Sequence, residues 1–315
     1  MNPTRSVARR LVVVLATLCT IGSRADAQDA PAFRVKMHRD IPYVTGAGAD
    51  AKKHRLDVYE PVGAPLVPKD PRGPEGQGAP VLMTVHGGAW QHGSKLYDLL
   101  LAHTFAECGI VTVAIDYRLS PEIRHPAHIR DVARAFDWVK RNVAKYGGDP
   151  DRVFIAGHSA GGHLVALLAT HEKYLAEVGR RTEEIAGVIP ISGLYRVGAT
   201  SFVFKNTFDP TREQLEEASP EFHVDDKQPP FLIIYAEHDL PLLDIQAIGM
   251  TRALEAHKSP VRLLRAADRN HVTIVLMIGT KDDPVTDAML DFIRGRAVDE
   301  KRSETAWSVD TIANH

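Results

Sequence analysis

The sequence VFIAGHSAGG, at residues 153–162, decides the predicted fold because it joins a strand to a helix through one serine. Residues 152–156 are typical of a buried strand, and residues 162–171 place apolar side chains at helical spacing. Between them, Gly157-His158-Ser159-Ala160-Gly161 fits the G-x-S-x-G pattern, in which the serine occupies a sharp turn and the helix directs its positive end toward the reacting group. We therefore predict that Ser159 is a nucleophile. The alternative is a structural glycine-rich turn with an idle serine.

A second glycine motif lies about seventy residues upstream. The apolar run at residues 81–85 predicts a strand, and it ends in His86-Gly87-Gly88-Ala89-Trp90. Gly87 and Gly88 allow the backbone to turn its N–H groups in one direction, as an oxyanion hole requires. A plain glycine turn after a strand is the alternative, but a serine turn downstream of such a loop favours the oxyanion interpretation.

A serine hydroxyl is a weak nucleophile, so it needs a neutral imidazole within hydrogen-bond reach and an acid that orients the imidazole. On a sheet of this kind the expected order is serine, acid, histidine. Asp239 follows the apolar strand at residues 231–235, and His271 follows the last predicted strand at residues 261–264. These two residues are the favoured partners of Ser159. Other candidates are Glu237 and Asp244 for the acid, and His223, His238 and His257 for the base.

Strand and helix patterns alternate along the chain, and their connections are too long for hairpins. This predicts an α/β fold with a mostly parallel sheet and helices on both faces. An antiparallel pair at residues 32–38 and 54–60 opens the sheet, and residues 61–80, rich in proline and glycine, form a connector. Residues 194–228 carry no strand pattern and are predicted to form a small cap, whose aromatic side chains either line the substrate pocket or pack the cap onto the body. The remaining strands are predicted at 111–115 and 186–191, and the helices at 96–108, 129–143, 242–257 and 286–294.

The length of 315 residues and a hydrophobic content of 44% fit one large α/β domain. Arginines precede an apolar run at residues 11–21, and small residues follow at 25–27, which is the pattern of a secretory signal peptide too short to span a membrane. The predicted organisation is a signal peptide at 1–27, one α/β domain at 28–300 and a polar tail at 301–315. We expect a secreted or periplasmic protein with no membrane anchor.

The formal net charge is −2, and removal of residues 1–27 takes away four arginines and one aspartate, so nucleic acid is an unexpected partner. Only Cys108 remains after that removal, which excludes an internal disulfide in the processed monomer. The fifteen histidines show no metal-ligand spacing, so we expect neither a metal nor another cofactor. The sequence does not indicate an oligomeric state. Asp116 and Arg118 are interpreted as a structural ion pair.

Four stretches together resemble the α/β-hydrolase carboxylesterases with an HGG oxyanion motif: HGGAW at 86–90, DYRLSP at 116–121, GGDPDRV at 147–153 and GHSAGG at 157–162. This group includes hormone-sensitive-lipase-like esterases, bacterial acetyl and feruloyl esterases, and kynurenine formamidases. The resemblance extends from about residue 54 to about residue 295. The lipase-like branch has a third glycine where this chain has Ala89-Trp90, which places the chain nearer the feruloyl-esterase and formamidase branch.

The resemblance implies a catalytic triad and an oxyanion hole. The catalytic residues would be Ser159, Asp239 and His271, and the oxyanion hole would be formed by the backbone N–H groups of Gly87, Gly88 and Ala160.

The expected activity is hydrolysis of short-chain or aryl carboxylic esters of the acetyl or feruloyl type through an acyl-enzyme. The expected partner is a small-molecule or polysaccharide-linked ester substrate. Arylformamide hydrolysis of the N-formylkynurenine type is the alternative with the same machinery, and a non-catalytic binding protein on the same fold is the alternative from another class.

Overall fold

A computed structural model describes residues 33–63, 78–198 and 202–295 of the chain. The signal peptide predicted at 1–27 and the polar tail predicted at 301–315 lie outside the described residues, as does most of the proline-rich connector.

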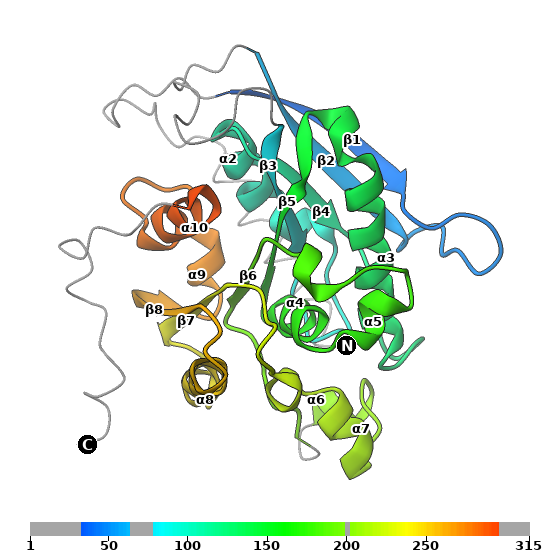
Figure 1. Ribbon diagram of the computed structural model, residues 1–315, viewed down its shortest axis with the longest axis vertical. Coiled ribbons are helices and arrows are strands. Elements are labelled where there is room, and N and C mark those ends of the chain that lie inside the picture. The colour runs from blue at the N-terminus through cyan, green and yellow to red at the C-terminus, as the bar shows by residue number, and fades with distance from the viewer. Residues whose placement is uncertain (1–32, 64–77, 199–201, 296–315) are drawn as a thin grey trace, which may run out of the picture. The chain divides into compact units, whose positions relative to one another are not determined.

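Within the described residues, one eight-stranded sheet forms the centre of the protein, with the strand order β1-β2-β4-β3-β5-β6-β7-β8 (Figure 1). The pairs β1/β2 and β2/β4 are antiparallel, and every other neighbouring pair is parallel. The strands are β1 Arg34–Pro42, β2 Arg55–Val62, β3 Ala79–Val85, β4 Val111–Ile115, β5 Gly148–His158, β6 Gly187–Ile191, β7 Phe231–His238 and β8 Val261–Asn270. The predicted antiparallel opening pair and the mostly parallel sheet are confirmed.

Helices cover both faces of the sheet because the strands alternate their apolar side chains between two cores. Val81 and Met83 of β3 join the core beneath α3 Ala127–Asn142, α4 Ala160–Thr170 and α8 Leu243–Ala256. Leu82, which points the opposite way, joins the core beneath α2 Leu99–Glu107, α9 Thr273–Leu276 and α10 Pro284–Arg294. The predicted α/β-hydrolase architecture, with helices on both faces, is therefore confirmed.

The remaining helical segments are short. They are η2 Lys95–Asp98, η3 Val143–Tyr146, α5 Lys173–Ala176, η4 Thr182–Glu184, α6 Phe202–Lys205, α7 Arg212–Glu217 and η5 Pro220–His223. Within the described residues, no helix combines the length and the apolar content needed to cross a membrane.

Two strands, β5 and β8, extend furthest beyond the runs that predict them. β5 begins at Gly148 rather than at residue 152, because residues 149–151 continue the strand instead of forming a turn. β8 continues through the mostly polar residues 265–270, and the four-residue helix α9 follows it. Polar residues that extend a strand past the core leave no apolar signal, and a helix of one turn has no periodicity to detect.

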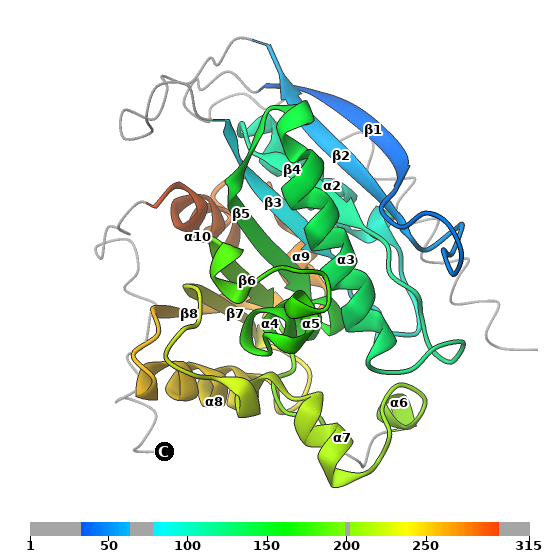
Figure 2. The same cartoon turned by 45° about the vertical axis from the view of Figure 1, so that its right-hand side comes forward.

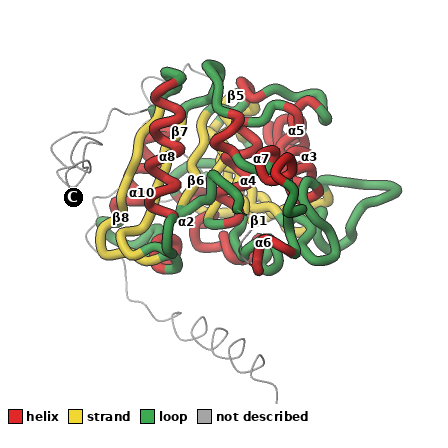
Figure 3. The backbone as a smooth tube through the Cα atoms, turned by 90° about the horizontal axis from the view of Figure 1, so that it is seen from below, coloured by secondary structure: helices red, strands yellow, loops and turns green. Residues whose placement is uncertain are grey.

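The insertion between β6 and β7 contains α6, α7 and η5, and it lies on the side of α4 and α5 (Figures 2 and 3). Its aromatic residues pack it onto the body: Tyr195 and Phe208 are buried, and the Phe208 ring lies 5.0 Å from the Trp90 ring. Phe222 is half exposed. The packing interpretation of these aromatics therefore describes Tyr195 and Phe208, whereas Phe222 remains open to solvent.

Asp116 and Arg118 do not pair with each other, which corrects the sequence prediction. The Arg118 guanidinium donates to both oxygens of Asp131 on α3, each at 2.8 Å. Asp116 accepts a hydrogen bond from the Lys95 backbone N–H at 2.9 Å. Both residues are structural: Arg118 connects its loop to α3, and Asp116 connects its loop to the start of η2.

Asp98, at the end of η2, is a buried carboxyl group whose Oδ2 has no hydrogen-bond partner among the described residues. Burial, together with the negative charge of Asp116, raises the pKa of Asp98 from 3.8 to about 7. The folded protein therefore retains a proton there that the unfolded chain loses near pH 4. The contribution of this proton to the free energy of unfolding is therefore full below about pH 4, decreases as pH rises, and is lost above about pH 7.

We expect Asp98→Asn to raise the thermal midpoint by several degrees at pH 8, because the amide removes a charge that burial and the nearby Asp116 disfavour. At pH 5 the midpoint should change little, since Asp98 is then already neutral. Thermal unfolding followed by circular dichroism at both pH values measures the difference. Asp151→Asn, at an exposed carboxylate, is the control. Equal effects at the two pH values would contradict the assignment.

Candidate active site

Ser159 occupies a strained turn between β5 and α4. Its backbone has φ 55° and ψ −117°, a conformation that costs a non-glycine residue about 1–3 kcal/mol. The flanking glycines have no room for side chains: a Cβ on Gly161 would lie 1.9 Å from the Val85 carbonyl oxygen, and one on Gly157 would lie 2.4 Å from the Gly161 carbonyl. The Ser159 N–H donates to the Ile191 carbonyl at 2.9 Å, so the turn is also tied to β6.

The structure brings Ser159, His271 and Asp239 together in one hydrogen-bonded chain. His271 Nδ1 donates to Asp239 Oδ1 at 2.7 Å, which leaves Nε2 as an acceptor for the Ser159 hydroxyl at 3.0 Å. The base and the acid come from the ends of two neighbouring parallel strands, β8 and β7. Their catalytic roles remain predictions, but the geometry is that required for a general base oriented by an acid.

Asp239 is buried yet held in its charged form. Burial opposes ionisation, but hydrogen bonds from His271, from Ser192 Oγ at 2.5 Å, and from the N–H groups of Ala236 and Leu240 at 3.0 and 2.8 Å favour it. Together these donors hold the pKa of Asp239 below its usual range. The carboxylate therefore remains available to stabilise a positive charge on His271.

The three predicted oxyanion residues lie around the nucleophile. Ala160 is the first residue of α4, where backbone N–H groups have no partner within the helix. Gly87 lies against the nucleophile, because a Cβ placed on it would be 3.3 Å from the Ser159 Cβ. Gly88 has φ 120°, and a Cβ there would lie 2.2 Å from the His92 carbonyl oxygen. A side chain at either glycine would displace the loop from Ser159.

Buried polar contacts fix the loop that carries Gly87 and Gly88. The His86 ring stacks on Tyr117 at 4.4 Å and donates from Nδ1 to the Gly87 carbonyl at 2.8 Å. The Tyr117 hydroxyl donates to the His86 carbonyl at 3.0 Å. Burial lowers the pKa of His86 to about 3, so this ring stays neutral. Next in the loop, Ala89 and Trp90 both have positive φ, and burial of the indole holds them there.

The other candidates for the acid and the base lie elsewhere. Glu237 pairs with Arg265 at 2.5 Å, and Asp244 lies in the first turn of α8. His223 donates to the Glu217 carbonyl in the insertion, and His257 pairs with Asp226. His238 lies at the end of β7 and is exposed. Within the described residues, none of these five side chains forms a hydrogen bond or an ion pair with Ser159.

Sequence reasoning missed three supporting residues: Ser192, Tyr117 and His158. Ser192 follows β6 and carries no motif, so only the fold places it beside Asp239. Tyr117 lies within the DYRLSP stretch, where the sequence prediction concerned only Asp116 and Arg118. His158 precedes the nucleophile, and its side chain contacts the loop of the base 113 residues later. Proximity of that kind follows from strand order rather than from spacing.

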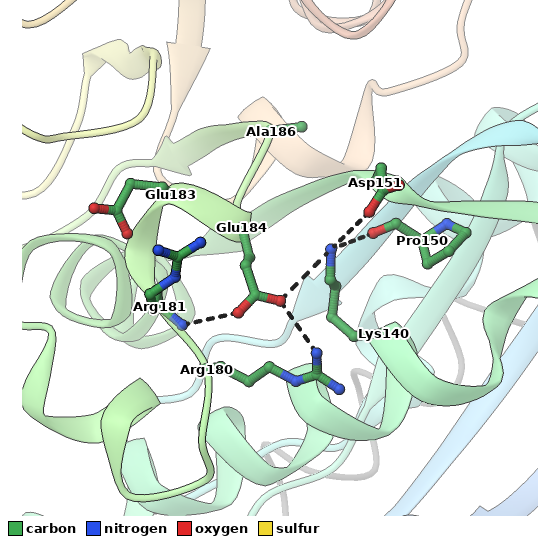
Figure 4. Close-up of a pocket in the computed structure, with 8 residues that line it drawn as sticks. All are labelled: Lys140, Pro150, Asp151, Arg180, Arg181, Glu183, Glu184 and Ala186. Atoms are coloured by element: carbon green, nitrogen blue, oxygen red, sulfur yellow. Dashed lines mark hydrogen bonds and ion pairs between the residues drawn. The ribbon is translucent and has the colours of Figure 1, made fainter.

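A separate hollow lies among charged side chains where β5 begins (Figure 4). It is lined by Lys140, Pro150, Asp151, Arg180, Arg181, Glu183, Glu184 and Ala186. Several of its charges are paired with one another: Glu184 lies 3.1 Å from the Arg180 guanidinium and 3.8 Å from the Lys140 ammonium. Because Ser159 follows the opposite end of β5, this hollow is separate from the candidate active site.

The fold and the arrangement around Ser159 are those of an α/β-hydrolase with a Ser-His-Asp constellation. The BD-FAE family model matches residues 70–254, which is more than half of the chain. The protein therefore belongs to the BD-FAE family, an α/β-hydrolase esterase family.

Two curated relatives come from Mycobacterium tuberculosis strain ATCC 25618 / H37Rv. Esterase LipQ is 30% identical over 85% of this chain and 65% of its own length, and Esterase LipC is 35% identical over 68% of this chain and 58% of its own. The chain thus spans less than two thirds of either relative. The crystal structure of Esterase B from Lactobacillus rhamnosis HN001 covers 96% of each chain with a TM-score of 0.70 at 19% identity, which shows a common fold.

We expect Ser192→Ala to lower kcat/KM for an ester by roughly tenfold to a hundredfold, because a hydrogen bond to a charged group contributes about 1.5–3 kcal/mol. Loss of this donor should raise the pKa of Asp239, so the reduction should be larger toward acid pH. Steady-state kinetics between pH 5 and pH 9 measure it. Ser259→Ala, at another buried serine, is the matched control. Equal rates for the two variants would exclude the proposed support of Asp239.

Proposed function

We propose that this protein is a serine carboxylic ester hydrolase that acts through an acyl-enzyme. The observation that carries the proposal is the continuous hydrogen-bonded chain from Ser159 through His271 to Asp239, beside the loop of Gly87 and Gly88. The names of the two mycobacterial relatives, both esterases, support the same reaction.

In the first half of the proposed reaction, His271 Nε2 accepts the Ser159 proton as Oγ attacks the ester carbonyl carbon. The carbonyl oxygen becomes an oxyanion, which the backbone N–H groups of Gly87, Gly88 and Ala160 stabilise. The imidazolium is stabilised by Asp239 at 2.7 Å. Collapse of the intermediate breaks the bond to the alcohol oxygen, and His271 gives that oxygen its proton.

In the second half, water replaces the alcohol. His271 accepts a proton from the water as its oxygen attacks the acyl carbon. Collapse of the second tetrahedral intermediate breaks the bond to Ser159 Oγ, which takes that proton from His271, and releases the carboxylic acid. The enzyme returns to its starting protonation state. No redox or metal co-reactant enters the balance.

The distribution of apolar surface supports an ester that carries an apolar or aryl group. Nine large apolar side chains of the described residues are half exposed or more, and all nine lie in segments that follow the carboxyl ends of β3, β6, β7 and β8. Eight of them, which we name the apolar rim, are Leu96, Tyr97, Leu100, Leu240, Leu242, Ile245, Val272 and Leu276, and the ninth is Phe222. Exposed apolar side chains gathered around one site are typical of a binding surface.

Three residues of the apolar rim lie next to the proposed catalytic residues in the chain or near the oxyanion loop. Val272 follows His271 and Leu240 follows Asp239 directly in the chain, and the Tyr97 ring lies 6.2 Å from the His86 ring. α2 and α9, which carry Leu100 and Leu276, share one core cluster. A short-chain acyl or aryl group bound at Ser159 would therefore have apolar neighbours, whereas a bare sugar would gain little from them.

We also propose that the enzyme acts outside the cytoplasm. The pattern at residues 1–27 supports this location, and the mass of the N-terminal peptide of the exported protein would test cleavage after Ala27.

Arylformamide hydrolysis is the second candidate, favoured by Ala89-Trp90 in the oxyanion loop. An extracellular location favours the ester. For the acetyl or feruloyl groups of plant polysaccharide, the support is the family resemblance alone.

We expect the wild-type protein to hydrolyse p-nitrophenyl acetate, and Ser159→Ala to lose at least about 10³-fold of kcat, because the acyl-enzyme cannot form. Release of p-nitrophenol measures both rates. An inactive wild-type protein, or a variant with the full rate, would favour the non-catalytic binding protein. With activity established, acetylated xylan, methyl ferulate and N-formylkynurenine distinguish the substrate classes.

We expect Leu100→Ser combined with Leu276→Ser to lower kcat/KM for p-nitrophenyl hexanoate by about tenfold, because each buried methylene contributes about 0.8 kcal/mol. The value for the acetate should change less than about twofold, since its acyl group is too short to use the same surface. Phe222→Ser, at the exposed aromatic of the insertion, is the control. A similar reduction for both esters would show that the apolar rim does not select the acyl group.

A further inference from the structure

We propose that His158 is a positioning residue for His271: its side-chain N–H fixes the main chain of the base relative to the nucleophile. The inference rests on the proposed function of the Ser159 site. His158 Nε2 donates to the His271 carbonyl oxygen at 2.8 Å, and the two rings lie 4.7 Å apart.

The hydrogen bond from His158 holds the backbone of His271, in addition to the contacts that hold its imidazole. At one end of the residue, Nε2 faces Ser159 Oγ at 3.0 Å, and at the other end the carbonyl accepts from His158. His158 and Ser159 are consecutive, so both ties lead to the same short stretch of backbone. The contacts of the imidazole with Ser159 and Asp239 orient the ring, and the bond from His158 also fixes the peptide of His271 relative to the nucleophile turn.

Apart from the contacts of the His271 imidazole, the base loop is held by hydrogen bonds within the loop and by pairing of Asn270 with His238 of β7. Asn270 Oδ1 accepts from the N–H groups of Val272 and Thr273 at 3.0 and 2.9 Å, and Thr273 Oγ1 accepts from the Asn270 N–H at 2.8 Å. These bonds shape the turn from β8 into α9. The bond from His158 is the contact that joins that turn to β5.

The environment keeps His158 in the form that this bond requires. Burial, strengthened by the charge that His271 carries when protonated, lowers the pKa of His158 to about 4. The ring is therefore neutral under ordinary conditions, with its proton on Nε2 and a lone pair on Nδ1. When His271 becomes an imidazolium during the reaction, a neutral neighbour does not oppose it.

The same ring also lies beneath the oxyanion loop. His158 Nδ1 is 3.1 Å from the position that a Cβ on Gly87 would occupy, and the His158 carbonyl oxygen is 2.9 Å from it. The imidazole thus occupies the space between the Gly87 turn and the base loop, and its size sets their separation. Displacement of a reacting group by about 1 Å can lower a rate about 10²-fold.

Three substitutions separate the hydrogen bond from the volume of the ring. His158→Phe retains a ring without a donor, His158→Gln retains an N–H donor at a similar reach, and His158→Asn carries the same amide on a side chain one methylene shorter. With p-nitrophenyl acetate, we expect the Phe and Asn variants to have a kcat about 100-fold below that of the wild type, with KM changed by less than about threefold. The kcat of the Gln variant should be at least about tenfold higher than that of the Asn variant. His257→Phe, at a histidine at the end of α8 that pairs with Asp226, is the control.

The rate at which a fluorophosphonate labels Ser159 should rank the variants in the same order as kcat. The reagent requires His271 as the base, and it tests the site without knowledge of the natural substrate. Full kcat in folded His158→Phe, or equal kcat for Gln and Asn, would overturn the proposal. If Phe does not fold, as judged by circular dichroism, the comparison of Gln and Asn decides.

A wild-type protein that neither hydrolyses esters nor takes the label would refute the proposed function instead. The positioning role is then decided by crystal structures of the wild-type protein and the His158→Asn variant. We expect the distance from His271 Nε2 to Ser159 Oγ to exceed hydrogen-bond range only in the variant. An unchanged distance would overturn the proposal.

Discussion

The lack of a side chain at Gly161 is the steric condition on which the active centre depends. With only a hydrogen at this position, α4 approaches the end of β3 so closely that a methyl group would lie 1.9 Å from the Val85 carbonyl oxygen. Val85 is the residue before His86, so the same contact sets the nucleophile helix against the start of the oxyanion loop. The strained backbone of Ser159 is retained because the sheet on one side and the helix on the other leave it no alternative.

Electrostatics around Ser159 divide between one group that is kept charged and several that are kept neutral. Asp239 is ionised because four donors converge on it, whereas burial keeps His86 and His158 neutral. The neutral rings still donate single hydrogen bonds to backbone carbonyls, and so they hold loops without adding charge. Such a site is organised before the substrate arrives, and little reorganisation is needed as charge develops on the reacting oxygen.

The sequence predicted those features that have a local cause. Glycine spacing around Ser159, the apolar runs of the central strands and the order of acid and base were sufficient to bring Ser159, Asp239 and His271 to one place. Ser192 and His158 were not recognised, because their partners are distant in the chain and become neighbours only through the order of β5, β6, β7 and β8. The extension of β8 at residues 265–270 was missed because four of its six residues are polar, so it contains no apolar run, although Ala266 is buried.

Every residue of α4 is buried, including its histidine and threonine. A helix without a polar face gains nothing from water, and eleven residues are too few for it to persist alone. It can form only as the sheet and the helices beside it close around it. The turn of Ser159 depends on that helix, so the nucleophile acquires its geometry in the same step that completes the core. Partly folded chains would therefore lack a preformed serine site, and Ser159 would acquire its reactivity only when folding is complete.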